Sequence, residues 1–239
     1  MIRRLVTMTE TRHLLALDGL ETSLSVRRHN RAKRTTLRLD AKQGGFVLVL
    51  PKRASLREGL AFAEENRDWM AARLSELPTR VAFADGSVLP YHNIDHRIRH
   101  RPDRRGSVWL ENGEIHVAGA TDHLPRRITD WLRHTAKAEL SSAAGRHADR
   151  LDLKISGLSV RDTRSRWGSC SAAGRLSFCW RLVMAPPWVA DYVAAHEVVH
   201  IAELNHGAGF WRLVDTLTPD RKKAEQWLRR HGAGLHLIG

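Results

Sequence analysis

The sequence predicts an α+β fold in which a strand-rich N-terminal part precedes a C-terminal part built from a mixed sheet on a helix. Up to about residue 118, short apolar or alternating segments are separated by turn-forming residues. After Gly119 a long helical pattern begins, and a second helical pattern near the C-terminus contains the sequence HEVVH. We therefore predict two parts, residues 1–118 and residues 119–239.

The N-terminal part begins with three predicted strands, SLSVRRH, TTLRLD and GGFVLVLP, which we expect to form a meander. A helix is predicted over residues 55–77, because Ser55 and Glu58 have the spacing of a capping box and Pro78 ends the pattern. Residues 81–118 return to short strands. Within them, the dipeptide Asn-Gly between SVWLE and EIHVAG is a strong hairpin signal.

The C-terminal part opens with a long predicted helix that begins near Pro125. Its apolar residues fall on one stripe: Ile128, Leu132, Ala136 and Leu140. Two strand candidates follow, GLSVRDT and LSFCWRLVMA, and the segment RSRWGSCSAAGR joins them. Pro186 and Pro187 then introduce the helix that contains HEVVH.

The composition indicates a folded protein of a reducing compartment. An apolar content of 42% suits a packed core. The two cysteines, Cys170 and Cys179, are too few for a disulfide framework. The basic start lacks the apolar run of a signal peptide, and no stretch approaches the roughly 18 apolar residues of a membrane span. We expect a cytoplasmic protein without a membrane partner.

The net charge of +13 attracts polyanions such as nucleic acid, nucleotides or acidic protein surfaces, without selecting among them. The densest basic stretch covers residues 26–40. Its cations would form one positive face if they serve an anionic partner: Arg27, Arg28, Arg31, Lys33, Arg34 and Arg38. A solvated face is the simpler interpretation. The nucleic-acid binding that we expect from this surface is therefore weak and salt-sensitive.

The C-terminal helix contains a candidate metal site. His196 and His200 are four residues apart, so they lie one turn apart on one helix face and can bind the same ion. Glu197 lies about 100° further round the helix, where it can act as a general base without binding the metal. His206 follows six residues after His200. We expect Asn205 to adopt the left-handed conformation that turns the chain back and brings His206 to the ion.

Three histidine nitrogens and one water would form an open tetrahedral zinc site of the catalytic kind. The histidine spacing equals that of the metzincin signature. However, Glu203 stands where that signature has glycine, and no methionine follows Met184 to form a Met-turn. The sequence therefore predicts a zinc site outside the metzincin class.

Other residues near the motif have open roles. Tyr192, one turn before His196, either contacts an oxyanion or is buried with its hydroxyl satisfied. A hydrogen bond from a ligand histidine could be accepted by any of three carboxylates: Asp191, Glu203 and Asp215. Residues 166–171 either bind a substrate backbone as an added strand or support the sheet.

Residues 164–211 contain RWGSCS, then LSFCWRLVMAP, then HEVVH followed by NHG and FW. In this order these segments closely resemble the YgjP-like metallopeptidase domain family, which is related to SprT-like proteases. The segments RRHNRAKRTTLRL and GGFVLVLP also resemble the family's N-terminal part, so the resemblance covers roughly residues 22–233. It implies a zincin-like zinc metallohydrolase, with His196, His200 and His206 as ligands and Glu197 as the acid/base residue.

Three functions are compatible with these residues. A metallopeptidase acting on a protein or peptide fits best, because Glu197 can take a proton from a zinc-activated water and return it to the leaving group. Some members of the resembled family are described as UTP pyrophosphatases, so a nucleotide substrate is the alternative. The third function is a nucleic-acid-associated module with a structural zinc. Against it, structural zinc normally has four protein ligands, and no cysteine lies near HEVVH.

Overall fold

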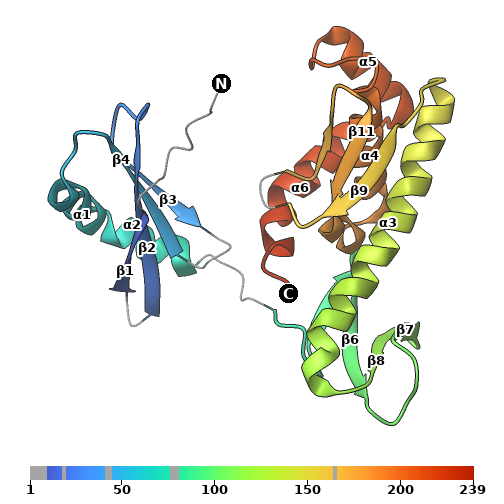
Figure 1. The fold of residues 1–239 in the computed structure, drawn as a ribbon, viewed down its shortest axis with the longest axis horizontal. Coiled ribbons are helices and arrows are strands. Elements are labelled where there is room, and N and C mark those ends of the chain that lie inside the picture. The colour runs from blue at the N-terminus through green and yellow to red at the C-terminus, as the bar shows by residue number, and fades with distance from the viewer. Residues whose placement is uncertain (1–9, 18–19, 41–44, 76–80, 164–165) are drawn as a thin grey trace, which may run out of the picture. The chain divides into compact units, whose positions relative to one another are not determined.

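The computed structural model describes residues 10–17, 20–40, 45–75, 81–163 and 166–239 (Figure 1). The chain forms two compact units, Met1–Thr79 and Arg80–Gly239, each with its own apolar core. Both units combine helices with a mixed sheet, which confirms the predicted α+β class. The functional division predicted at residue 118 falls inside the second unit and stays a prediction.

The first unit contains one sheet made of β1 (Glu10–Leu17), β2 (Leu20–His29), β3 (Thr36–Asp40) and β4 (Gly45–Pro51). The predicted meander is wrong, because β4 lies between β2 and β3, parallel to the first and antiparallel to the second. The reason is the apolar run of β4, which is buried on both faces: Phe46 and Leu48 lie on one face and Val49 on the other. A strand covered on both faces is typical of the interior of a sheet with parallel pairs.

The helix predicted over residues 55–77 is interrupted. Within the described residues it forms α1 (Leu56–Glu65) and α2 (Arg67–Ser75), and Asn66 lies between them. The capping box is confirmed: Ser55 Oγ accepts a bond from Glu58 N, and Glu58 Oε2 accepts one from Ser55 N, both at 3.1 Å. Asn66 ends α1, and its side chain donates to the carbonyl of Phe62 at 2.7 Å.

The basic stretch of the first unit is partly structural. Arg28 donates to the carbonyls of Pro51, Lys52 and Ala54, so its charge holds the turn before α1. Four other cations are exposed: Arg31, Lys33, Arg34 and Arg38. Binding of an anionic partner by these residues stays a prediction.

The second unit begins with a sheet of β5 (Val88–Tyr91), β6 (Ile94–Arg101), β7 (Val108–Glu111) and β8 (Glu114–Ala118), in the order β5-β6-β8-β7. The predicted hairpin is confirmed, since Asn112 and Gly113 have φ angles of 51° and 74° and join the antiparallel strands β7 and β8. Positive φ at both positions is the requirement of a type I′ turn.

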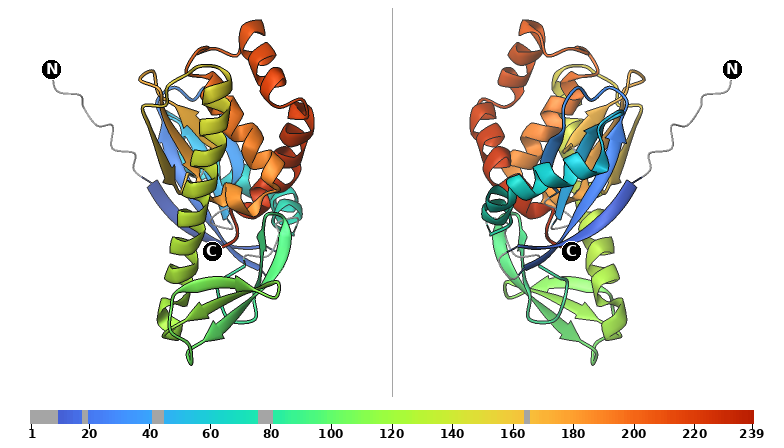
Figure 2. Two further views of the ribbon diagram at one scale, coloured as in Figure 1. Left: turned by 90° about the vertical axis from the view of Figure 1, so that its right-hand side faces the viewer. Right: turned by 90° about the vertical axis from the view of Figure 1, so that its left-hand side faces the viewer.

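After the short 3-10 helix η1 (Thr121–His123), helix α3 (Leu124–Arg150) runs the length of the second unit, from β8 to β9 (Figures 1 and 2). The predicted stripe is confirmed, because all four of its residues are buried: Ile128, Leu132, Ala136 and Leu140. This stripe packs on the buried face of both sheets and makes α3 the common support of the unit.

The second sheet of this unit consists of β9 (Gly157–Arg161), β10 (Gly168–Cys170) and β11 (Arg175–Cys179), in the order β10-β11-β9. It is mixed, as predicted, because β11 is antiparallel to β10 and parallel to β9. The 3-10 helix η2 (Trp180–Met184) leads into α4 (Pro187–Val199), and α5 (Ala208–Leu217) and α6 (Arg221–Leu235) complete the unit. No helix in the described part of the chain combines the length and apolar character of a membrane span.

Candidate metal centre

Helix α4 places the first two histidines of the motif. The helix packs against α3, α5, α6 and β10, and Val189, Val193 and Val198 are buried in the core of the unit. α4 ends at Val199, and His200 forms its C-cap with helical dihedral angles. His196 and His200 therefore share one face, with ring centroids 5.0 Å apart.

The segment after α4 returns His206 to this face, but not in the predicted way. Asn205 does not have the positive φ that we expected. Instead the chain turns through backbone bonds from Glu203 N to the Val199 carbonyl and from Gly207 N to the Asn205 carbonyl. Repeated tight turns thus replace one left-handed residue. His206 Nε2 comes to lie 3.2 Å from His196 Nε2.

The three histidines form one cluster. One ligand atom from each of His196, His200 and His206 lies within 4.8 Å of the others. The ring of His206 is 5.1 Å from that of His196 and 4.7 Å from that of His200. Three imidazole nitrogens at this spacing are a suitable donor set for one zinc ion, which prefers nitrogen and sulfur ligands.

Phe210 on α5 forms the apolar wall of the cluster. Its fully buried ring lies 4.9 Å from His196, 4.5 Å from His200 and 4.6 Å from His206, measured between centroids. Trp211 stacks on His206 at 5.5 Å. Neither aromatic residue has a role predicted from the sequence, although both belong to the segment FW that resembles a known family.

Hydrogen bonds define which nitrogen each of two histidines turns toward the cluster. His200 Nδ1 lies 3.0 Å from the backbone oxygen of Glu203, and His196 Nδ1 lies 3.5 Å from the hydroxyl of Tyr192. Because the Glu203 carbonyl can only accept, His200 Nδ1 is the donor and its Nε2 is left for a metal.

The three carboxylates that we considered as partners of the ligand histidines have other contacts. Asp191 pairs with Arg146 at 3.1 Å and with His147 at 3.0 Å. Asp215 pairs with Arg221, and Glu203 contributes its backbone carbonyl instead of its carboxylate. The carboxylate closest in role is Glu225 on α6, which accepts a bond from Tyr192 at 3.1 Å. No spacing pattern in the sequence predicts the contact between Glu225 and Tyr192.

Glu197 points toward β10 rather than into the histidine cluster. It is only 6% exposed, and its burial raises its pKa to about 7 although the positive charge of Arg166 opposes this shift. It lies against Gly168: a Cβ at that position would be 2.5 Å from Glu197 Cγ. The glycine of RWGSCS therefore leaves the space that this carboxylate occupies.

Strand β10 is an edge of its sheet and lies next to Glu197. Its bonds to β11 include Ser171 N to the Arg175 carbonyl and Cys179 N to the Trp167 carbonyl. Backbone groups alternate in direction along a strand, so those of Gly168 and Cys170 point away from β11. Two residues beside Glu197 thus present backbone donors and acceptors at the sheet edge.

The two cysteines are not part of the metal cluster. Burial raises the pKa of both thiols, and at Cys170 the negative charge of Glu197 raises it further. Both residues are free thiols, which agrees with the expected absence of a disulfide framework.

Burial has the opposite effect on the histidines. The pKa of His196 is lowered to about 4, mainly by burial and in addition by the neighbouring His200, His206 and Arg221. The pKa of His200 is also lowered, mainly by burial. Neutral imidazoles can coordinate a metal, whereas protonated ones cannot.

A family model described as YgjP-like, metallopeptidase domain, matches residues 33–231 of the chain. This range includes all four residues of the candidate site, residues 33–79 of the first compact unit and residues 80–231 of the second. A search of curated proteins finds no match.

The metal-free protein is expected to show two opposing effects of pH. His196 has a pKa of about 4 instead of 6.5, so between these values the unfolded chain binds more protons and stability rises with pH. Glu197 has a pKa of about 7 instead of 4.5, so between these values the folded chain binds more protons and stability falls as pH rises. The two residues should therefore act in opposite directions over pH 4.5 to 6.5.

Urea unfolding of chelator-treated variants separates these effects. Relative to the unsubstituted protein, the free energy of unfolding should rise more steeply with pH in Glu197→Gln and less steeply in His196→Gln. Tyr91→Phe should leave the pH dependence unchanged, because the pKa of Tyr91 is about 12. Identical slopes of the free energy of unfolding against pH in all four proteins would show that burial shifts the pKa of neither His196 nor Glu197.

Proposed function

This chain belongs to the YgjP-like metallopeptidase domain family, and we propose that it is a zinc-dependent metallopeptidase. In this proposal the zinc ligands are His196, His200 and His206, and Glu197 is the general base. The supporting observation is that three imidazoles form one cluster, and the buried carboxylate of Glu197, the residue after His196, lies against Gly168 of the edge strand β10.

The donor set supports a catalytic rather than a structural zinc. Within the described chain, the cluster contains three histidines and no fourth histidine, cysteine or acidic residue. Structural sites use four protein ligands, whereas catalytic sites keep one position open. When bound there, zinc would lower the pKa of a water toward neutrality and polarise a substrate carbonyl.

Glu197 is suited to moving the proton. A pKa of about 7 lies close to neutral pH, where a residue can both accept a proton and return it to a leaving amine. No hydrogen bond from another described residue occupies its carboxylate. The Arg166 cation nearby favours the ionised form, which is the form that accepts a proton.

The β10 edge favours a peptide as the substrate. An extended peptide can add to a free strand edge through backbone bonds, here with Gly168 and Cys170. This addition would carry a scissile carbonyl past Glu197, which lies against Gly168. A nucleotide would need cations at the site: the guanidinium of Arg221 is already bound by Asp215 at 2.6 Å and Glu225 at 3.1 Å, which leaves Arg166 as the cation near Glu197.

Replacing Glu197 by glutamine tests its role, because the amide keeps the shape of the side chain but cannot take the proton. We expect the variant to keep its zinc while peptide hydrolysis falls about 10²-fold or more, as is usual for loss of an acid/base group. Hydrolysis is measured on a casein-derived peptide library and, separately, on nucleoside triphosphates. Zinc content is measured on the same samples.

Three results would contradict parts of this proposal. Full activity of Glu197→Gln would mean that another residue moves the proton. Loss of zinc from the variant would make Glu197 part of the metal site. Hydrolysis of UTP without any hydrolysis of peptides would replace the peptidase by the nucleotide pyrophosphatase.

Gly168→Ala tests the close approach of β10 to Glu197. The added Cβ would lie 2.5 Å from Glu197 Cγ and Oε1, so the carboxylate must move. We expect kcat/KM to fall by about 10²-fold with zinc retained, since misplacement by about 1 Å can have that effect. Gly145→Ala is the matched control, because a Cβ there meets nothing within 4 Å. Equal activity of the two variants would mean that the position of Glu197 does not limit the reaction.

A further inference from the structure

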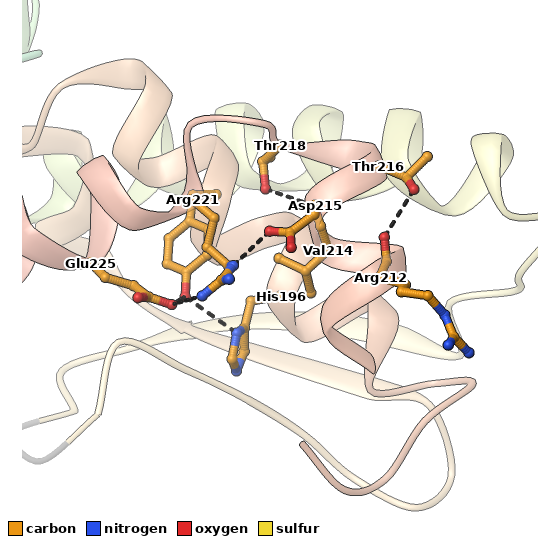
Figure 3. A network of polar contacts seen from close by, with 9 residues as sticks. His196, Arg212, Val214, Asp215, Thr216, Thr218, Arg221 and Glu225 are labelled. Carbon is orange, nitrogen blue, oxygen red and sulfur yellow. Dashed lines mark hydrogen bonds and ion pairs between the residues drawn. The ribbon is translucent and has the colours of Figure 1, made fainter. Parts of the chain in front are cut away.

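A chain of four side chains links α5 and α6 to the metal cluster (Figure 3). Asp215 accepts a bond from Arg221 Nε at 2.6 Å, and Arg221 Nη1 donates to Glu225 Oε1 at 3.1 Å. The same Glu225 oxygen accepts the hydroxyl of Tyr192 at 3.1 Å. The Tyr192 oxygen lies 3.5 Å from His196 Nδ1, at the long end of hydrogen-bond distances. We call these four residues, Asp215, Arg221, Glu225 and Tyr192, the α6 network.

The direction of each bond in the α6 network follows from the chemistry of its groups. Arg221 can only donate, and contact with Asp215 and Glu225 raises its pKa further. Glu225 therefore accepts from both Arg221 and Tyr192. An ionised carboxylate only accepts, so the proton of the 3.1 Å bond belongs to the Tyr192 hydroxyl.

The α6 network is compatible with only one tautomer of the His196 ring. Because the Tyr192 proton goes to Glu225, the Tyr192 oxygen can only accept from His196 Nδ1. His196 must then carry its proton on Nδ1 and its lone pair on Nε2. The 3.2 Å contact with His206 Nε2 is compatible with this, since that nitrogen can donate to His196 Nε2 in the metal-free protein.

Arg221 is also linked to His206, through Trp211. Its guanidinium carbon lies 4.5 Å from the ring centre of Trp211, and Trp211 in turn stacks on His206. The Arg221 side chain is only 16% exposed, so this contact is largely shielded from water. One cation at the start of α6 thus supports the surroundings of both His196 and His206.

We propose that Tyr192, Glu225 and Arg221 are positioning residues that hold His196 in the tautomer protonated on Nδ1 and so direct its Nε2 to the metal. The proposal rests on the proposed function, because it takes His196 as a metal ligand. It also excludes the role of Tyr192 as an oxyanion contact: the hydroxyl proton is already bound by Glu225 and is not free for a substrate.

The first test is the zinc affinity of Tyr192→Phe, measured by competition with a chromophoric chelator. Loss of a partner of this kind lowers metal affinity about 10- to 100-fold, and we expect a decrease in that range. Tyr91→Phe is the matched control, because Tyr91 donates to Glu139 at 3.0 Å in the same unit but away from the histidine cluster. Its zinc affinity should equal that of the unsubstituted protein. Equal affinities of the two variants would overturn the proposal.

The second test does not need the metal. Nitrogen-15 chemical shifts of His196 in the metal-free protein report which ring nitrogen carries the proton. We expect Nδ1–H in the unsubstituted protein and in Tyr91→Phe, and a mixture with Nε2–H in Tyr192→Phe. Retention of Nδ1–H in Tyr192→Phe would also overturn the proposal.

Failure of the proposed function and failure of the positioning role would give different results. If the unsubstituted protein binds no zinc, the proposed function fails, whereas the tautomer measurement still decides the role of the α6 network. If Tyr192→Phe does not fold, Glu225→Leu replaces it, because leucine removes the acceptor of the Tyr192 hydroxyl and leaves that proton free to turn toward His196. A decrease in zinc affinity and the appearance of Nε2–H in Glu225→Leu would support the proposal, and no change in either would overturn it.

Discussion

The burial of α4 is the constraint on which the candidate site depends. The helix is surrounded by α3, α5, α6 and β10, so its position and rotation are determined by packing on nearly every side. The packing of α4 therefore determines the directions of two adjacent residues that the proposed reaction needs. His196 faces the histidine cluster, and Glu197 faces Gly168 on β10. The same burial keeps the imidazole neutral and brings the carboxyl pKa close to neutrality.

Local patterns were sufficient to predict much of this structure from the sequence. The capping box of Ser55 and Glu58, the Asn112-Gly113 hairpin and the buried stripe of α3 all depend on residues close together in the chain. The histidine pair depends on helical spacing alone. These features follow from backbone geometry that is the same in any protein.

Features that depend on distant parts of the chain could not be predicted in this way. The position of β4 between β2 and β3 is set by which pairing buries its apolar run best. The turn that returns His206 uses backbone bonds that no residue type specifies, and the expected left-handed Asn205 is not needed. Glu225 reaches Tyr192 only because α6 packs on α4.

The proposed function requires that His196, His200 and His206 hold one zinc ion with an open fourth position. X-ray absorption spectroscopy at the zinc edge of the zinc-loaded protein reports the type, number and distance of the ligands. We expect three imidazole nitrogens and one further oxygen ligand, all at about 2.0 to 2.1 Å. A sulfur ligand, a fourth imidazole or only two imidazoles in the spectrum would contradict it.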